Sequence, residues 1–392
     1  MEVKQIYTLM NNVSSEVLGK TDVISEDLTG IVDMGTAVFN ANAIDNYVKS
    51  LVNHIGKVVF VNRPYSGKIP SVLMDAWEFG SVLEKISADI PQAEENDSWN
   101  LTDGTEYKQD VFHKPTVTAK FFNSKVTFEV PVSITERQVK ESFSSASQLN
   151  GFLSMIYNAV EKSMTIKTDA LVMRTINNMI AETLNADKTA FTPSGKQAVD
   201  YTSASTVRCV NLLKLYNDKF SKTLTVAQAI TDPEFIRFAS YTMGLYSDRL
   251  QSISTLFNVG GKERFTPKES LHVVLLSDFA KAAQTYLYSD TYNKQEVLLP
   301  NAETVPSWQA SGKDYAFANV SKIDVKSASG VSVSVGGVLG VMFDRDALGV
   351  CNSDKRVTTN YNAKAEFFNN YYKFDAEYFN DTNENFVVFF AA

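Results

Sequence analysis

The stretch Ser144–Leu184 reads SSASQLNGFLSMIYNAVEKSMTIKTDALVMRTINNMIAETL, and it decides how the rest of the chain is interpreted. It contains no Pro, and its only Gly is Gly151. Its apolar side chains recur mostly at steps of three or four residues, the period of an α-helix. They are Leu149, Phe152, Leu153, Ile156, Val160, Met164, Ile166, Leu171, Ile176, Met179 and Ile180. The stretch therefore predicts a helix, with N-cap candidates at Ser144, Ser145 and Ser147.

One unbroken helix over this stretch would extend for roughly 50–60 Å at 1.5 Å per residue. The commonest helices have only about 11–12 residues. We interpret the stretch as a scaffold helix along which the other elements are arranged. A second interpretation stays open, two ordinary helices that meet near Ser163–Thr168, because Thr165, Ile166 and Thr168 are β-branched.

Upstream of the helix, residues 71–133 have the pattern of a long β-hairpin. Trp77–Ala88 alternates in part, and Val111–Val132 alternates apolar and polar residues around a break at Asn123-Ser124-Lys125. The polar, acidic run Gln92–Gly104 lies between these two arms. The pattern predicts two extended arms joined by a charged tip.

Such a hairpin has little of its own chain to pack against. An isolated two-stranded ribbon is marginally stable in water, so we expect the hairpin to lie on a neighbouring subunit. The candidate interface residues at its tip are Glu94, Glu95, Asp97, Trp99 and Asp103. The alternative is an ordinary hairpin that packs on its own domain.

The remaining segments predict shorter elements. Near the start, a short helix is expected at Val3–Leu18, an amphipathic helix within residues 36–57 and a buried strand at Val58–Val61. Residues 185–350 mix helix and strand patterns, which is typical of a compact α/β or α+β domain. The helices expected there are Ser203–Ser221, one beginning at Asp232-Pro233, and Phe279–Tyr288. The expected strands are Leu271–Leu276, Val331–Val335 and Val338–Phe343.

The segment Arg356–Ala392 is unusually aromatic. It holds eleven Phe and Tyr residues, and Val387-Val388-Phe389-Phe390 has the composition of a strand. An apolar strand at this position is normally tied into a sheet. We therefore expect the segment to be a structural member of the fold rather than a loose tail.

Composition excludes several classes of protein. The 392 residues include 37 Lys and Arg against 45 Asp and Glu, a net charge of −8, which argues against a surface built to grip nucleic acid or anionic lipid. No run reaches the ~18 apolar residues of a membrane span, and no secretion signal is recognised. Cys209 and Cys351 lie far apart, and we expect both to be buried thiols in a reducing compartment.

The residues that catalysis or metal binding would need are not grouped in the sequence. His54, His113 and His272 each stand alone, and His272 lies in the apolar run LHVVLL, where a hydrogen-bonded core or edge histidine is expected. Gly260-Gly261-Lys262 lacks the context of a phosphate-binding loop, and Glu94, Glu95 and Asp97 lack EF-hand spacing. Asp344-Arg345-Asp346 is interpreted as an ion-paired turn. The sequence therefore predicts no catalytic, cofactor-binding or metal-binding residues, and we expect no enzyme and no cofactor.

Three stretches carry a resemblance to a known family. They are FNSKVTFEVPVSITERQVKESF (Phe122–Phe143), RFTPKESLHVVLLSDFAKAAQTYLYSDTYN (Arg264–Asn293) and the aromatic stretch Gly337–Phe390. Together with the order of arm, hairpin, long helix and C-terminal sheet, they resemble the major capsid proteins of tailed bacteriophages with the HK97-type fold. None of the three is a catalytic signature, so the resemblance rests on the length and order of the match.

The resemblance implies an α+β fold of the HK97-like capsid type and an assignment of each region. Residues 1–40 would be an N-arm, 41–70 a peripheral-domain segment and 71–133 the extended E-loop hairpin. Residues 134–189 would be the peripheral domain with its spine helix, and 190–349 the axial domain. Residues 350–392 would return to the peripheral domain and complete its C-terminal sheet.

The resemblance also implies a function. Many copies would assemble into pentamers and hexamers of an icosahedral phage head in the host bacterial cytoplasm, and the head would enclose double-stranded DNA without sequence-specific binding. Portal, scaffolding and decoration proteins are the further partners it allows, and no membrane is involved. The alternatives are an encapsulin-type or gene-transfer-agent shell of the same fold, or a phage or surface-layer binding protein.

Overall fold

The structure is a computed structural model. It describes residues 11–12, 14–16, 18, 69, 72–74, 83–91, 93–107, 112–114, 116–135, 137, 146–196, 198–288, 302–309, 314–326 and 330–392. The chain divides into two compact units. Unit 1 comprises residues within 1–70, 125–172 and 350–377, and unit 2 comprises residues within 71–124, 173–349 and 378–392.

The predicted elements between residues 19 and 68 lie outside the described residues, as does most of the expected N-arm. Residues 11–12, 14–16 and 18 are helical, within the short helix predicted at Val3–Leu18. The division into arm, peripheral and axial domains stays a prediction.

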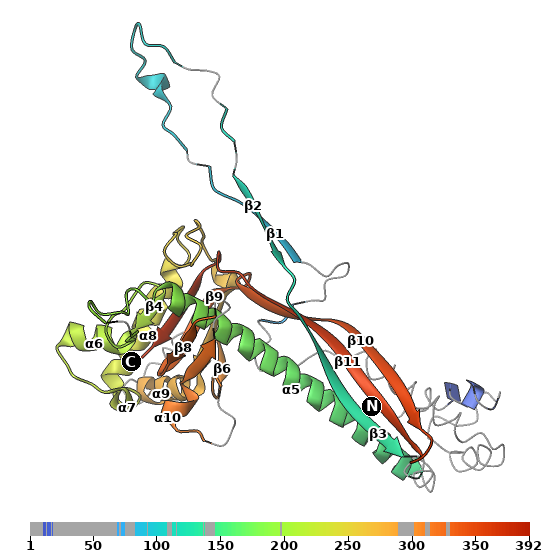
Figure 1. Ribbon diagram of the computed structural model, residues 1–392. Helices are drawn as coiled ribbons and strands as arrows, with labels where there is room; N and C mark the ends of the chain where they lie inside the picture. The colour runs from blue at the N-terminus through green and yellow to red at the C-terminus, as the bar shows by residue number, and fades with distance from the viewer. Residues whose placement is uncertain are drawn as a thin grey trace. The chain divides into compact units, whose positions relative to one another are not determined.

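The long helix is α5, Ala146–Ala186, and its 41 residues form one unbroken element (Figure 1). The prediction of a single helix is confirmed, and the alternative of two helices is wrong. At the suspected break, the Thr168 hydroxyl donates to the Met164 carbonyl at 3.1 Å, so this β-branched residue satisfies its polar group inside the helix. In unit 2 the helix buries Ile176, Met179, Ile180 and Leu184.

Unit 1 contains the three-stranded sheet β10-β11-β3, formed by Leu348–Asn362, Phe367–Asn380 and Lys125–Thr135. Strand β3 alternates exposed and less exposed residues and runs antiparallel to β11. Phe128 and Phe374 face each other in this register, with ring centroids 5.1 Å apart. The sheet is thus held by cross-strand pairs, the ordinary unit of sheet stabilisation.

The pairing of β3 changes the interpretation of residues 71–133. The second arm expected for the hairpin is split at Asn123-Ser124: β2, Val117–Phe122, pairs with β1, Leu83–Ala88, whereas β3 pairs with β11. The hairpin ladder therefore ends at Phe122. The alternating pattern predicted the strands correctly, but it does not reveal which partner each strand takes.

Unit 2 is built around a five-stranded sheet in the order β4-β12-β9-β5-β6. Its strands are Cys209–Asn211, Phe386–Phe390, Val338–Asp344, Leu271–Leu276 and Ala302–Val305. The helices of this unit are α6 (Leu212–Phe220), α7 (Val226–Ala229), α8 (Pro233–Arg249), α9 (Ser277–Tyr288) and α10 (Phe317–Val320). A smaller pair, β7 (Ile323–Lys326) with β8 (Ser332–Val335), completes it.

Several of these elements match the prediction from the sequence. The strands expected near Leu271–Leu276, Val331–Val335 and Val338–Phe343 are present, and so is the helix expected at Phe279–Tyr288. Helix α8 begins where Asp232-Pro233 predicted it, because the Asp232 carboxylate accepts hydrogen bonds from the backbone N–H groups of Glu234 and Phe235 at 2.8 and 3.0 Å.

The helix predicted at Ser203–Ser221 is wrong in its first half. Residues Cys209–Asn211 form β4, and α6 begins only at Leu212. Cys209–Asn211 pairs in parallel with Val388–Phe390 of β12, and the Asn211 side chain caps the helix by accepting from Lys214 N–H at 3.1 Å. Val210, which fitted the helical period, is instead buried in the sheet.

Strand β12 lies second in the sheet, between β4 and β9, and all five of its residues are buried. One face packs with α6, α8 and α9 through Val387 and Phe389, and on the other face Phe390 lies near Phe191 and Tyr201. The expectation that this segment is a structural member is confirmed. However, β12 joins the sheet of unit 2 while β10 and β11 pair in unit 1, so residues 350–392 do not complete one common sheet.

Gly337 makes the close contact that the last residues of the chain require. Its φ is +72°, and a Cβ at this position would lie 1.9 Å from the Ala391 carbonyl oxygen. In addition, Ala391 N–H donates to the Gly337 carbonyl at 2.8 Å. Neighbouring Gly336 has an ordinary φ and open space around its Cβ position, so the two glycines form a matched pair.

We expect Gly337→Ala to lower the stability of unit 2 by at least ~1–3 kcal/mol, because the new methyl group meets backbone and the φ is strained. Gly336→Ala should change stability by less than about 1 kcal/mol. Thermal and urea unfolding followed by circular dichroism measures both. Equal midpoints for the two variants would contradict this account of the β9–β12 contact.

Candidate functional site: the hairpin of strands β1 and β2

Strands β1 and β2 form an antiparallel ladder that runs from Leu83↔Phe122 to Ala88↔Val117. The Ser87 and Thr118 hydroxyl groups lie 3.0 Å apart across the ladder, and Asp89 N–H donates to the Thr116 carbonyl at 2.9 Å beyond it. Figure 1 shows the chain continuing past the ladder as a long loop that carries the short 3-10 helix η2, Asp97–Trp99. The predicted pairing of two arms is confirmed for Leu83–Ala88 with Val117–Phe122, and the acidic run lies between them as predicted.

An ordinary surface strand turns its apolar side chains inward and its polar side chains outward, and in this ladder the distribution is largely reversed. The half-buried face is polar over most of its length, with Lys85, Ser87, Thr118 and Lys120, and it has one apolar pair, Leu83 and Phe122, at the end next to the rest of the subunit. The opposite face is exposed and mainly apolar; its large apolar side chains are Ile86 (65% exposed), Val117 (57%) and Phe121 (62%), and its one charged residue is Glu84, opposite Phe121. A contiguous exposed apolar face of this kind is typical of a surface that binds a partner.

The tip carries further exposed apolar groups among acidic ones. Trp99 is 93% exposed, and Leu101 and Phe112 are also exposed. Local hydrogen bonds shape the loop: Asn96 Oδ1 accepts from Ser98 N–H at 2.8 Å, and the Tyr107 hydroxyl accepts from Thr102 N–H at 3.0 Å. Residues 92–107 contain five acidic residues and no Lys or Arg. The tip is therefore an acidic loop with aromatic side chains available for contact.

The structure places all five predicted interface residues in this loop. Glu94, Glu95, Trp99 and Asp103 are exposed, and Asp97 is the first residue of η2. Their role in a contact between subunits stays a prediction.

At its base the ladder is attached to unit 2 by ion pairs that sequence reasoning missed. Lys85 Nζ lies 2.8 Å from Glu384 Oε1 and 3.0 Å from Asp381 Oδ2, and Lys120 Nζ lies 2.9 Å from Asp381 Oδ1. Arg264 Nε donates to Glu384 Oε1 at 3.2 Å. We call these five residues the ionic clasp. Both carboxylates are nearly buried, at 2% and 10% side-chain exposure for Asp381 and Glu384.

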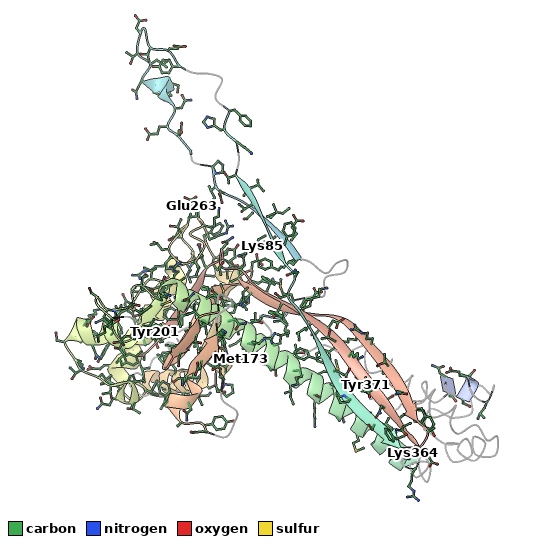
Figure 2. The ribbon with its side chains drawn as sticks, in the orientation of Figure 1. Lys85, Met173, Tyr201, Glu263, Lys364 and Tyr371 are labelled. Atoms are coloured by element: carbon green, nitrogen blue, oxygen red, sulfur yellow. The ribbon has the colours of Figure 1, made fainter. Side chains whose placement is uncertain are left out.

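Three further contacts surround the ionic clasp. Lys262 Nζ lies 2.9 Å from the Asp89 carboxylate, so the loop of Lys262 and Arg264 also touches the end of β1. The rings of Phe122 and Phe379 lie 5.1 Å apart. Lys120 Nζ also donates to the Thr382 hydroxyl at 3.3 Å. Figure 2 shows Lys85 at the base of the ladder, near the loop that carries Glu263.

The charged groups of the ionic clasp shift one another's pKa values in the direction that favours the charged forms. Burial by itself would raise the pKa of Asp381, but hydrogen bonds from Lys120 and Asn383 N–H and the charge of Lys85 outweigh it, so the pKa is lowered. Burial likewise would lower the pKa of Lys85, but Glu384 and Asp381 outweigh it, so the pKa is raised. Each charged form is thus stabilised by its partners, as expected for buried groups that are well paired.

A signal for the clasp was present in the sequence but was incomplete. Lys85 and Lys120 occupy the same face of the two alternating arms, and the ladder pairs them directly. Like charges in directly opposed positions are destabilising unless an anion lies between them. That argument requires a nearby carboxylate, but Asp381 is 261 residues beyond Lys120. No local pattern connects the two.

The other residues singled out in the sequence have structural surroundings. Cys209 and Cys351 are buried thiols that form no disulfide, as predicted. Asp344-Arg345-Asp346 forms a turn, in which Asp344 accepts from Asp346 N–H at 2.9 Å, whereas the ion pairing expected within it stays a prediction. The hydrogen bond expected for His272 is wrong: both ring nitrogens are buried without a partner among the described residues, burial lowers the pKa, and the ring lies 5.9 Å from that of Phe343.

The described part of the chain contains no cluster of three His, Cys, Asp or Glu side chains arranged to hold a metal ion. Within the same residues, no helix combines the length and the apolar character that crossing a membrane requires. The site consists of a contact surface and its attachment.

Several solved structures are similar to the chain. A chain from the capsid structure of Staphylococcus phage Andhra has 8% identity and a TM-score of 0.50, covering 85% of this chain and 86% of its own. A chain from the structure of head fiber and inner core protein gp22 of native bacteriophage P68 has 8% identity, the same coverages and a TM-score of 0.47. A capsid chain of a native GTA particle has 9% identity, coverages of 85% and 92%, and a TM-score of 0.41.

At such low identities a structural likeness concerns the fold alone, and the first match supports a mixed α+β phage capsid fold. No curated protein matches the chain. The model of the Phi29-like phage major capsid protein family, however, matches residues 8–390, nearly the whole sequence. The resemblance inferred from the sequence is confirmed, and the chain belongs to the family of Phi29-like phage major capsid proteins.

Proposed function

We propose that this capsid protein assembles as pentamers and hexamers of an icosahedral head that encloses double-stranded DNA, and that the β1–β2 hairpin joins neighbouring copies. Assembly takes place in the host bacterial cytoplasm. In this proposal the hairpin acts as the E-loop and α5 as the spine helix. The observation that carries the proposal is the inverted hairpin, whose polar face is turned to its own subunit and whose apolar face is exposed.

The energetics favour a second copy as the partner of this face. Fully burying an apolar side chain contributes about 1.5–3 kcal/mol, so Ile86, Val117 and Phe121 together supply several kcal/mol when covered. A hairpin that each subunit donates to the next makes a head-to-tail contact, and such contacts close into rings when the rotation between subunits permits. Modest contacts repeated around a ring add up through multivalency.

The net negative charge of the chain supports a shell that encloses DNA without binding it tightly. The chain has a net charge of −8, so its surface as a whole repels a polyanion. An inner wall of this kind confines DNA without retaining it during packaging. Sequence-specific binding is not part of the proposal. Portal, scaffolding and decoration proteins would join the same shell.

The primary test is electron microscopy of the purified protein. Uniform hollow shells, or rings of five and six subunits, are expected. A protein that stays monomeric at high concentration would overturn the proposal. Particles isolated from infected cells that contain a host-encoded cargo protein instead of phage DNA would favour an encapsulin-type shell, and particles filled with host DNA would favour a gene-transfer agent.

Deletion of Gln92–Gly104 should leave a folded subunit that does not form stable shells, because the tip contacts neighbouring copies and not its own core. Circular dichroism and thermal unfolding report the fold, and electron microscopy with sedimentation reports assembly. If the deletion unfolds the subunit, the tip packs within its own chain. If normal shells form, the tip is not an assembly contact.

Phe121→Ser should reduce the yield of shells at least tenfold while leaving subunit stability nearly unchanged, because the side chain is exposed in the free subunit and buried in the shell. Tyr241→Ser on α8 is the matched control, since Tyr241 is also 62% exposed. Sedimentation of assembly reactions measures both variants. An equal effect of the two substitutions would show that the hairpin face has no special part in assembly.

A further inference from the structure

The ladder of β1 and β2 is attached to its own subunit mainly through charge. On the face turned toward unit 2, Ser87 and Thr118 bond to each other, and Lys85 and Lys120 reach the carboxylates of the ionic clasp. The apolar side chains on this face are the opposed pair Leu83 and Phe122, and Phe122 packs on Phe379. A hairpin held in this way depends on a few directional contacts rather than on a broad apolar surface.

The two lysines of the ladder require a nearby negative charge. Lys85 and Lys120 are directly opposed in the ladder, where like charges repel. Asp381 resolves the repulsion because one of its oxygens binds each lysine, at 3.0 and 2.9 Å. The carboxylate thus fixes both strands at once. If either lysine loses its charge, the ladder keeps its backbone pairing but loses one of its two attachments to Asp381.

The carboxylates are themselves rigidly held. Asp381 N–H donates to the Ala347 carbonyl at 2.7 Å, and Asp381 Oδ1 accepts from Asn383 N–H at 3.0 Å. Gly260 N–H donates to the Thr382 carbonyl at 2.8 Å from the neighbouring loop. Buried strand β12 follows directly after this turn. The turn therefore provides a fixed base against which the hairpin is oriented.

A small rotation at this base has a large effect at the tip. The chain from Leu83 to Trp99 spans at most roughly 55 Å when extended, so a rotation of about 10° moves the tip by roughly 10 Å. A displacement of that size exceeds the diameter of an aromatic side chain. The direction set at the base determines which surface of a neighbour the tip reaches.

From these contacts we propose that the ionic clasp fixes the direction in which the hairpin extends from the rest of unit 2, and that Lys85 is the positioning residue for the contact of the hairpin with the neighbouring subunit. This inference rests on the proposed function, because the direction has consequences only in an assembly. Lys85 has this role because it alone binds both carboxylates, and it also donates to the Asp346 carbonyl at 3.2 Å.

The test compares Lys85→Met, which keeps the apolar stem and removes the charge, with Lys85→Arg, which restores a cation. Lys214→Met is the control, since Lys214 forms an exposed pair with Asp218 on α6. The direction of the hairpin is measured by electron–electron distance spectroscopy between spin labels at Thr116→Cys and Tyr241→Cys in the full chain. The native Cys209 and Cys351 are buried, so labelling is selective for the introduced cysteines.

We expect Lys85→Met to remain folded, to broaden the distance distribution at least twofold and to give at least tenfold fewer regular shells, with irregular particles in their place. Lys85→Arg should restore both measurements, and Lys214→Met should resemble the unmodified protein. Raising the salt concentration should broaden the distribution in the unmodified protein and much less in Lys85→Met, because partly exposed ion pairs are screened.

An unchanged distance distribution in Lys85→Met, or regular shells at normal yield, would overturn the inference. If Lys85→Met does not fold, Lys120→Met provides the same test, since it removes the bonds of Lys120 to Asp381 and Thr382 and its cation–π contact with the Phe122 ring, while the bonds of Lys85 to both carboxylates remain. If the unmodified protein forms no shells, the proposed function fails, while the distance measurement on the free subunit still decides whether the clasp sets the direction of the hairpin.

Discussion

The burial of β12 is the constraint on which the rest of unit 2 depends. Its five apolar residues, Phe386–Phe390, are buried on both faces, so the strand is stable only with β4 and β9 on its two sides. The Asn211 side chain reinforces this arrangement: it donates to the Ala392 carbonyl at 2.9 Å and also caps α6. Because β12 is fixed, the turn just before it is fixed, and that turn carries both carboxylates of the ionic clasp. The core thus determines where the hairpin is attached.

Because the hairpin is attached mainly through ion pairs, the apolar residues of its outer face are not needed for the attachment and stay exposed. If the inner face of the ladder were apolar, it would pack on unit 2 and the outer face would be polar. Lysines on the inner face reverse this distribution. Buried ion pairs add little net stability, because desolvation offsets much of the attraction, but they are directional. This distribution supports the proposed function, in which the stability of the subunit comes from its core and the hairpin contacts other copies.

The periodicity of apolar residues was sufficient to predict the long helix and the hairpin. Helix α5 was predictable because its apolar side chains recur with the helical period, and the hairpin because its arms alternate around a polar tip. The helix predicted at Ser203–Ser221 was wrong in its first half because Val210 fitted the helical period, whereas in the structure it pairs with Phe389 of β12 in a strand. The pairing of β3 with β11 and the clasp between Lys120 and Asp381 join residues more than 200 positions apart. Contacts of that kind depend on the assembled fold, and no periodicity along the chain encodes them.

The acidic tip offsets a liability that the apolar face creates. A two-stranded ribbon has two open edges, and an exposed apolar face beside open edges favours aggregation of free subunits. Residues 92–107 carry five acidic residues without a Lys or Arg, so two free hairpins repel each other where they would first meet. A neighbouring surface without that acidic charge is not penalised in this way. The exposed apolar face could meet either a second free hairpin or the surface of a neighbouring subunit. The negative charge of the tip disfavours the first contact, which leads to aggregation, relative to the second, which the proposed shell requires.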